Sequence, residues 1–436
     1  MANVFNKFSA INSYYDLGYK FFLLGTFFLP SALPISVFLY LLSSLISISL
    51  NKILINRSNL NYPLLICFGI IIFATFNVTF FNKPEIFDDY NLSNIWINLL
   101  NWLPVTVFYF SFKSYLISFK NRLAFAKFII CGTVPVIVSM ILQKFFNIYG
   151  PFETLFGSIV WFQKPLLTDN LGVSGLFSNA NYTGSWLILI LPFSFLLVNY
   201  SKRKKFRITC FIILILINYM ILLTASRNAL MGLLINFILL FGIKNFFKKS
   251  SFLIPFISII YLLVSNMNLG LTKYLPIKII ERVINIFDYS RLAIWQSALN
   301  SIQERPIFGW GGSTFSLLHY ENNYNLGNPE TFINAQHTHN VFLELAYNYG
   351  LPLSIILCLT IISFLLRSIK LNYFSDIFSY ESFANKVWLS TLIIFFVTHN
   401  FDITFYDGKI SIMVSLLFAG NSCIIKELEN KKHLVN

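Results

Sequence analysis

Charged side chains are scarce in this sequence of 436 residues. They make up 11% of the chain, whereas 56% of the residues are hydrophobic. A soluble globular domain carries roughly 25% charged residues, so the composition excludes an ordinary soluble domain. Apolar runs close to the ~20 residues needed to cross a bilayer recur from one end of the chain to the other. The sequence therefore predicts a polytopic membrane protein.

Cysteine is also rare, and several familiar motifs are absent. The five cysteines fall within or beside apolar runs and form no C-x-x-C pair, so nothing indicates a disulfide framework or a zinc knuckle. The stretch MANVFNKFSAINSYYDLGYK lacks a basic start, a short apolar core and a cleavage site, and we expect no removable signal peptide. Neither a P-loop nor a dinucleotide fingerprint occurs, so no nucleotide or other cofactor is expected.

The apolar runs predict an all-α fold. We expect one polytopic domain over residues 1–436 with about twelve transmembrane helices and both termini in the cytoplasm. The first two spans could instead be one long helix kinked at FLPSALP. The predicted spans are 17–31, 33–50, 62–81, 95–116, 123–146, 182–200, 207–225, 228–247, 251–267, 340–366, 385–400 and 407–424.

Acidic residues are fewer than basic ones, which gives a net charge of +14. A basic surface could bind nucleic acid, but lysine and arginine recur in every second loop, for example at Lys113, Lys120 and Arg122 and in SKRKKFR at 201–207. Such alternation is typical of the cytoplasmic loops of membrane proteins. We therefore expect the lipid bilayer as a partner, and no nucleic acid.

Two long loops fall on the extracytoplasmic side, at 147–181 and 268–339. Loops of this length usually have a function. Within the second, residues 283–306 show apolar residues at helical spacing, and this pattern places Arg291 one turn before Trp295. We expect this loop to carry short helices, to fold onto the membrane face and to give Arg291 a partner.

A second arginine lies at the membrane face. Residues 207–247 suffice for two spans with almost no loop between them, so the turn falls around Thr224–Asn228 and Arg227 begins a helix. A charge near the hydrocarbon is a functional hypothesis by default, although an arginine can also reach out to lipid headgroups. We favour anion binding, because the guanidinium fork matches phosphate oxygens.

The glycine-rich stretch PIFGWGGSTF (306–315) could also bind an anion. Gly309, Gly311 and Gly312 allow tight backbone turns that could expose N–H groups as a nest. A simple turn is the commoner role of such a stretch.

Histidine is rare, with five residues in the chain, and two of these lie in NAQHTHNVFLELAYNYGLP (334–352). His337 and His339 could be metal ligands, polar groups at a helix start, or a general base. We expect the two rings to point apart and no carboxylate pair to be fixed nearby, so no metal site is predicted. Neutral imidazole accepts a proton from a hydroxyl near pH 7, which favours a general base. Asn340 can cap the following helix.

Taken together, two arginines and one histidine suit a diphosphate leaving group and a hydroxyl nucleophile. The hypothesis is that Arg227, Arg291 and His339 converge at the outer membrane face. Their spacing alone does not establish this convergence.

Several stretches resemble the O-antigen ligase/polymerase superfamily and occur in that family's order. The resemblance covers residues 170–366 and includes the loop 268–339. It rests on SGLFSNANYTG (174–184), TASRNAL (224–230), SRLAIWQSALNSIQERPIFGWGGSTF (290–315) and HTHNVFLELAYNYGLP (337–352). Asn181 matches the polar member of the first motif, and His339, followed by Asn340, matches the family histidine.

The chain also departs from the family pattern. Asn228 stands where a glycine often follows the arginine, and Asn348 stands where an acidic residue is common before the Gly350 position. Glu344 lies on the same predicted helix but not at the matching position. His337 has no clear counterpart, and we interpret it as a neighbour of His339.

The resemblance implies a metal-independent, inverting glycosyltransferase of the bacterial inner (plasma) membrane with its active site on the periplasmic face. The implied donor is a glycan on undecaprenyl diphosphate, held by Arg227 and Arg291, while His339 activates the acceptor hydroxyl. Asn181, Gly309, Gly311 and Asn340 are the implied substrate-binding residues.

The identity of the acceptor distinguishes a ligase from a polymerase. A ligase would use a lipid A core sugar, and a repeat-unit polymerase of the same superfamily would use a growing glycan. Outside the enzymes, a polysaccharide transporter or flippase and a non-catalytic scaffold remain as alternatives; a transporter would often show inverted repeats.

Overall fold

A computed structural model describes residues 2–50, 61–84, 90–166, 172–244, 289–319, 335–373 and 379–435. The predicted span 251–267 and part of the long loop 268–339 lie outside these residues. The helices are α1 (Ala2–Phe28), α2 (Leu33–Ser49), α3 (Asn61–Phe76), the π-helix η1 (Asn77–Phe81), α4 (Ser93–Asn98), the 3-10 helix η3 (Leu99–Asn101), α5 (Leu103–Leu116), α6 (Phe119–Phe145), α7 (Ala180–Tyr200), α8 (Lys204–Leu223), α9 (Arg227–Phe241), α12 (Tyr289–Glu304), α14 (Val341–Tyr349), α15 (Leu351–Tyr373), α16 (Tyr380–His399) and α17 (Gly408–Val435).

The prediction of a helical fold is confirmed, with one small addition. Strands β1 (Phe152–Thr154) and β2 (Ile159–Trp161) pair antiparallel between α6 and α7. Within the described residues, 7 helices are long and apolar enough to cross a membrane. They are Asn61–Phe81, Ser93–Leu116, Phe119–Phe145, Ala180–Tyr200, Lys204–Leu223, Leu351–Asn372 and Gly408–Lys432. The number twelve stays a prediction.

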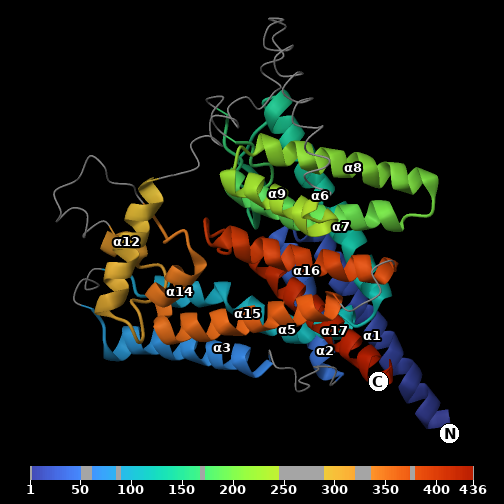
Figure 1. Cartoon of the computed structure of the whole chain (residues 1–436), viewed down its shortest axis with the longest axis horizontal. Helices are drawn as coiled ribbons and strands as arrows, with labels where there is room; N and C mark the ends of the chain where they lie inside the picture. Colours follow the sequence, from blue (N-terminus) through green and yellow to red (C-terminus); the bar gives the residue numbers. More distant parts are fainter. Residues whose placement is uncertain are drawn as a thin grey trace, which may run out of the picture.

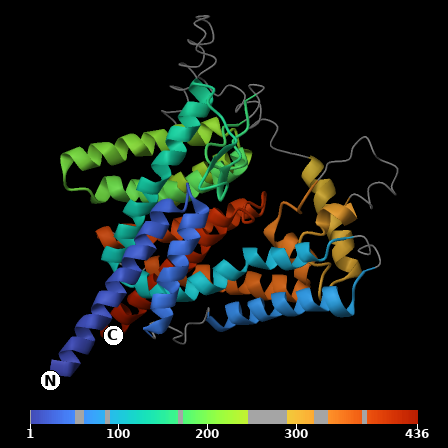
Figure 2. The ribbon, with the colours of Figure 1, turned by 180° about the vertical axis from the view of Figure 1, so that it is seen from behind.

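The long helices lie side by side (Figure 1). Helix α7 packs against α8, α9 and α16, and α17 packs against α5 and α16. Helix α12 lies at one end of the helical body, whereas both termini lie toward the other end, in both views (Figures 1 and 2). The fold therefore has one end that carries the long-loop helix and an opposite end that carries the termini.

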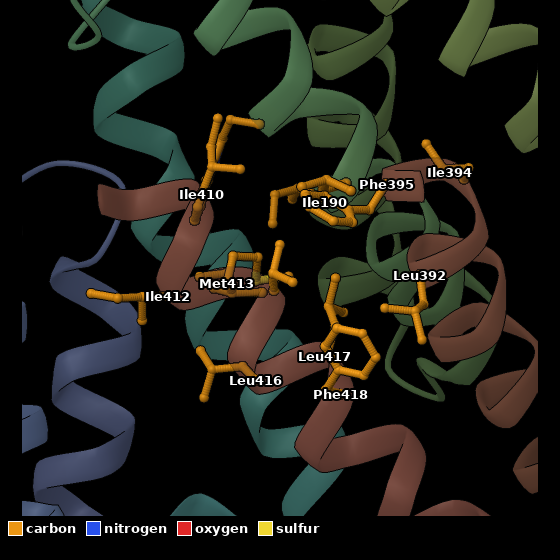
Figure 3. Close-up of a cluster of buried hydrophobic side chains, with 14 of the residues drawn as sticks. Ile190, Leu392, Ile394, Phe395, Ile410, Ile412, Met413, Leu416, Leu417 and Phe418 are labelled. Carbon is orange, nitrogen blue, oxygen red and sulfur yellow. The ribbon is translucent and has the colours of Figure 1, made fainter. Parts of the chain in front are cut away.

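Buried apolar side chains from α7, α16 and α17 form part of the main core. Figure 3 shows Ile190, Phe395, Met413 and Leu417 among them, and all four are at most 3% exposed. A second cluster lies where α12 meets α14 and includes Ile302, Trp310, Phe315 and Tyr347. Helix α12 and the described stretch that follows it thus have their own core, which fixes α12 against α14.

The predicted span 340–366 is wrong at its start. Helix α14 ends at Tyr349, Gly350 has φ 92° and ψ 160°, and a separate helix α15 begins at Leu351. The apolar pattern continues across Gly350, so it does not reveal the break. The alternative of one kinked helix at FLPSALP is also wrong, because α1 and α2 are separate helices that pack against each other.

Two basic residues assigned to a cytoplasmic loop are in fact buried. The Lys113 Nζ donates a hydrogen bond of 2.6 Å to the Asn61 side-chain oxygen. The Arg122 guanidinium pairs with Glu427 at 2.6 Å and also donates to the carbonyl oxygens of Leu116 and Ile117, at the end of α5. These two charges stabilise helix packing rather than a loop.

Replacing Gly350 with alanine should destabilise the protein strongly. The φ and ψ of Gly350 fall in a region that is open essentially to glycine alone, where another residue costs about 1–3 kcal/mol. An added Cβ would also overlap the carbonyl group of Ile307. Thermal melting of the purified protein should show a clear drop for G350A. The matched control is G69A, because a Cβ at Gly69 meets no atom within 4 Å; equal melting temperatures would contradict this account.

Candidate functional site

His339 and Asp402 form the centre of the candidate site. The His339 Nδ1 lies 2.9 Å from the Asp402 Oδ1, and the two residues are 63 positions apart in the chain. The His339 side chain is 27% exposed and that of Asp402 5%. The carboxylate is thus covered, while the imidazole stays accessible from outside.

The environment of Asp402 keeps it ionised. Burial works against the charge, but the hydrogen bond from His339 and the attraction of neighbouring groups, the Arg291 guanidinium among them, outweigh it and lower the pKa of Asp402. An ionised carboxylate only accepts hydrogen bonds, so the His339 Nδ1 must donate. In the neutral ring this leaves Nε2 with the lone pair, which is the form that a general base requires.

Local backbone geometry directs His339 toward Asp402. His339 has φ 55°, a left-handed conformation that few non-glycine residues adopt. The next residue, Asn340, begins α14: its Oδ1 accepts the N–H groups of Phe342 and Leu343 at 3.0 and 3.1 Å. The prediction that Asn340 caps this helix is confirmed.

Asn340 also links the segment that carries His339 to the segment that carries Asp402. Its Nδ2 donates to the carbonyl oxygen of Asn400 at 3.1 Å, two residues before Asp402. The Oδ1 of Asn340 thus accepts two hydrogen bonds within the helix cap, and one of the two N–H groups on its Nδ2 donates to Asn400. The second N–H on Nδ2 could donate to a ligand. A substrate-binding role for Asn340 stays a prediction limited to that single donor.

A buried carboxylate supports the turn that carries His339. Glu344 is 4% exposed and accepts the backbone N–H of Thr338 at 2.9 Å, the Tyr406 hydroxyl at 2.5 Å and the Asn348 amide at 3.1 Å. Helix α14 therefore does carry a satisfied carboxylate next to the site. It comes from Glu344, one turn before the position at which the family commonly has an acid.

Moving the carboxylate from position 344 to position 348 tests whether this part of α14 tolerates only one negative charge. N348D would bury a second negative charge against Glu344, and like charges four residues apart on a helix repel each other. We expect a loss of stability and activity for N348D, and recovery in the double variant E344Q/N348D, in which the new amide oxygen at position 344 can still accept the N–H of Thr338. Melting temperature and transfer rate of both variants check this; a double variant worse than N348D would contradict it.

Arg291 lies close to this centre. It is half-buried in the first turn of α12, and its charge contributes to the lowered pKa of Asp402. Helix α12 packs against α14, the helix that His339 precedes. The charge of Arg291 thus acts on Asp402, while a convergence of Arg291 with His339 stays a prediction.

Arg227 and Asn181 begin two neighbouring helices. Ser226 caps α9 by accepting the N–H of Ala229, which places the predicted turn at 224–226 and Arg227 at the first helical position. Asn181 lies in the first turn of α7, after the cap residue Asn179. Helices α7 and α9 pack together, and both side chains are half-buried. Their convergence with His339 stays a prediction.

The predicted anion nest at Gly309 and Gly311 is wrong. The N–H groups of Gly309, Trp310 and Gly311 donate to the carbonyl oxygens of Arg305, Tyr347 and Asn348. The last two are carbonyls at the end of α14, so these glycines close that helix end and let two backbones approach. Their backbone N–H groups already donate to these carbonyl oxygens, so these N–H groups are not available to bind a substrate anion.

The expectation that the two histidine rings point apart is also wrong. The ring centroids of His337 and His339 are 4.6 Å apart, and the His337 ring also contacts Tyr406. Burial lowers the pKa of His337, and His339 acts in the same direction, whereas Glu344 and Asp402 oppose the shift. His337 is therefore a neutral neighbour of the site at pH 7.

Sequence reasoning missed the segment 400–409 that follows α16. Asp402 orients His339, Tyr406 donates to Glu344, and Lys409 donates to the carbonyl oxygen of Leu176 at 2.8 Å. The available signal was NFDITFYDGK, a short polar stretch with two acidic residues between two apolar runs. In a chain with 18 acidic residues, such a pair between two apolar runs is a signal of a functional segment.

Comparison with known proteins supports the motif analysis. Residues 211–358 match the model of the O-Antigen ligase family. The matched stretch includes Arg227, Arg291, His339 and Asn340 but neither Asn181 nor Asp402. No curated protein matches the chain. Together with its apolar helices, the match indicates a multi-pass protein of the inner membrane, and residues 211–358 are similar to the O-antigen ligase family.

Proposed function

We propose that the chain is a glycosyltransferase that moves a glycan from undecaprenyl diphosphate to an acceptor hydroxyl at the periplasmic face of the inner membrane. The observation that carries this proposal is the His339–Asp402 pair, an accessible imidazole oriented by a covered carboxylate. Such a pair suits removal of a proton from a hydroxyl group. As in a ligase, the acceptor is a lipid A core sugar.

The reaction balances without a cofactor. The acceptor hydroxyl gives its proton to the His339 Nε2 while its oxygen attacks the anomeric carbon of the donor glycan. The bond from that carbon to the diphosphate breaks, and the electron pair leaves with the diphosphate oxygen. Attack opposite the leaving group inverts the anomeric centre.

The two arginines stabilise the leaving group. Guanidinium groups bind phosphate oxygens in pairs, and charge builds on the diphosphate as the bond breaks. The charge of Arg291 acts on Asp402, and its helix α12 packs against α14. Arg227 lies at the N-terminus of α9, where the helix dipole adds to the attraction for an anion.

An apolar cavity beside the site suits the lipid part of the donor. It is lined almost entirely by apolar side chains of α3, α5 and α14 to α17. Phe342 and Phe405 in its wall lie two or three residues from Asn340 and Asp402. An isoprenoid tail that enters between these helices would keep the diphosphate at the level of His339, with the rest of the tail in the bilayer.

The orientation follows from the positive-inside rule. The basic turn SKRKKFR between α7 and α8 lies at the end opposite α12, toward the termini (Figure 1). Basic connections face the cytoplasm in most membrane proteins. This supports cytoplasmic termini and a periplasmic His339.

Glycan analysis of a strain that lacks this gene tests the proposal. If long chains accumulate on the lipid carrier while lipid A core stays unmodified, the protein is a ligase. If only single repeat units remain, the protein is a polymerase of the same superfamily. Unchanged surface and carrier-linked glycans, in a strain where no second gene of this family is present, would contradict glycan transfer by this chain.

A further inference from the structure

Three potential metal ligands lie together at the candidate site. His337, His339 and Asp402 each offer one ligand atom, and these atoms all lie within 4.8 Å of one another. Tetrahedral zinc with bonds of 2.0–2.2 Å separates its nitrogen and oxygen ligands by ~3.3 Å. Small side-chain rotations would therefore bring the three atoms into one coordination sphere.

A second observation points to a ligand here. Asp402 is 4% exposed, and its Oδ2 is buried without a hydrogen-bond partner within the described part of the chain. Buried carboxylate oxygens are normally satisfied, so such an atom needs an explanation. A cation bound by Asp402 and the two imidazoles would provide one.

The chemical types of the three ligands favour zinc over calcium and magnesium. Two imidazoles and one carboxylate are ligands of zinc, whereas calcium and magnesium prefer oxygen ligands alone. Three protein ligands leave a fourth position for water. The nearby positive charge of Arg291 weakens cation binding, while the buried carboxylate of Glu344 beside His337 favours it.

We propose that His337, His339 and Asp402 form a zinc site and that bound zinc inhibits the protein by occupying the base. Zinc bound through the His339 Nδ1 replaces the hydrogen bond to Asp402 and leaves the ring proton on Nε2, so the ring has no lone pair to accept the proton of the hydroxyl. His337 then serves inhibition and not transfer. The inhibitory part rests on the proposed function, whereas the binding of zinc does not.

The test measures binding and activity separately. Purified full-length protein in detergent is titrated with Co²⁺, whose visible absorption reports coordination by imidazole, and Zn²⁺ is added in competition. The wild type should bind one equivalent, and H337Q and H337N should each bind at least ten times more weakly. The control is H319Q, because His319 lies elsewhere, bonded to Ser297 and stacked on Phe315. Equal binding by the wild type and both His337 variants would overturn the site.

Transfer assays complete the test. Zn²⁺ should inhibit the wild type and H319Q, while H337Q should keep a transfer rate near that of the wild type and resist Zn²⁺. Zinc binding without inhibition of an active wild type would overturn the inhibitory role. A wild type that binds zinc but transfers no glycan after chelation would contradict the proposed function and leave the metal site standing, so the two failures are distinguishable.

Discussion

Replacing Asp402 with asparagine should lower the rate of glycan transfer by about 10²- to 10⁴-fold. An ionised Asp402 accepts the His339 Nδ1–H at 2.9 Å and so fixes the tautomer with a basic Nε2. An asparagine amide can instead donate to Nδ1, which moves the ring proton to Nε2 and removes the base. The charge that stabilises the imidazolium is lost as well.

The measurement is single-turnover transfer by D402N and H339Q alongside the wild type. Both variants should melt near the wild-type temperature, because the shapes of the side chains are nearly conserved. The rates should fall together and not additively in the double variant, since the two residues act as one unit. H319Q serves as the matched control and should keep most of the activity. Full activity of D402N would remove Asp402 from the mechanism.

Lysine in place of either arginine should reduce transfer by about 10²- to 10³-fold. R291K and R227K keep the positive charge but lose the paired N–H groups that fit phosphate oxygens. Since negative charge on the diphosphate grows toward the transition state, the loss should appear mainly in kcat and less in KM.

The matched control for these variants is R305K. Arg305 follows α12, lies over the Trp310 ring and donates to the carbonyl oxygen of Asn82, so it belongs to the region around α12 without a proposed contact to the diphosphate. R305K should transfer glycan nearly as fast as the wild type. An equal loss in R305K would indicate that the region around α12 has shifted as a whole, and unchanged kinetics of R291K and R227K would exclude both from the site.

Local signals in the sequence predicted much of the fold. The short turn before Arg227 and the cap at Asn340 follow from residue types next to the helices they begin, and both are confirmed. The break at Gly350 was missed because hydrophobicity does not change there, and the close approach of the Ile307 backbone to Gly350 comes from a distant position in the sequence.

The site itself depends on contacts between distant segments. His339 could be selected by residue type, but its partner Asp402 follows 63 positions later, and no spacing rule relates the two. The glycines at 309 and 311 suggested an anion nest because glycine allows tight backbone turns that can expose N–H groups. Trp310 and Gly311 donate to carbonyls at the end of α14, which the sequence could not place beside them.

The central claim is that His339, oriented by Asp402, accepts the acceptor proton during transfer from a polyprenyl diphosphate. The most direct measurement uses purified protein in liposomes that contain a polyprenyl diphosphate-linked glycan and a lipid-linked sugar acceptor. Release of polyprenyl diphosphate and formation of the glycosylated acceptor are followed for the wild type and H339Q. We expect stoichiometric release and product with the wild type and almost none with H339Q. Equal product with both proteins would contradict the account.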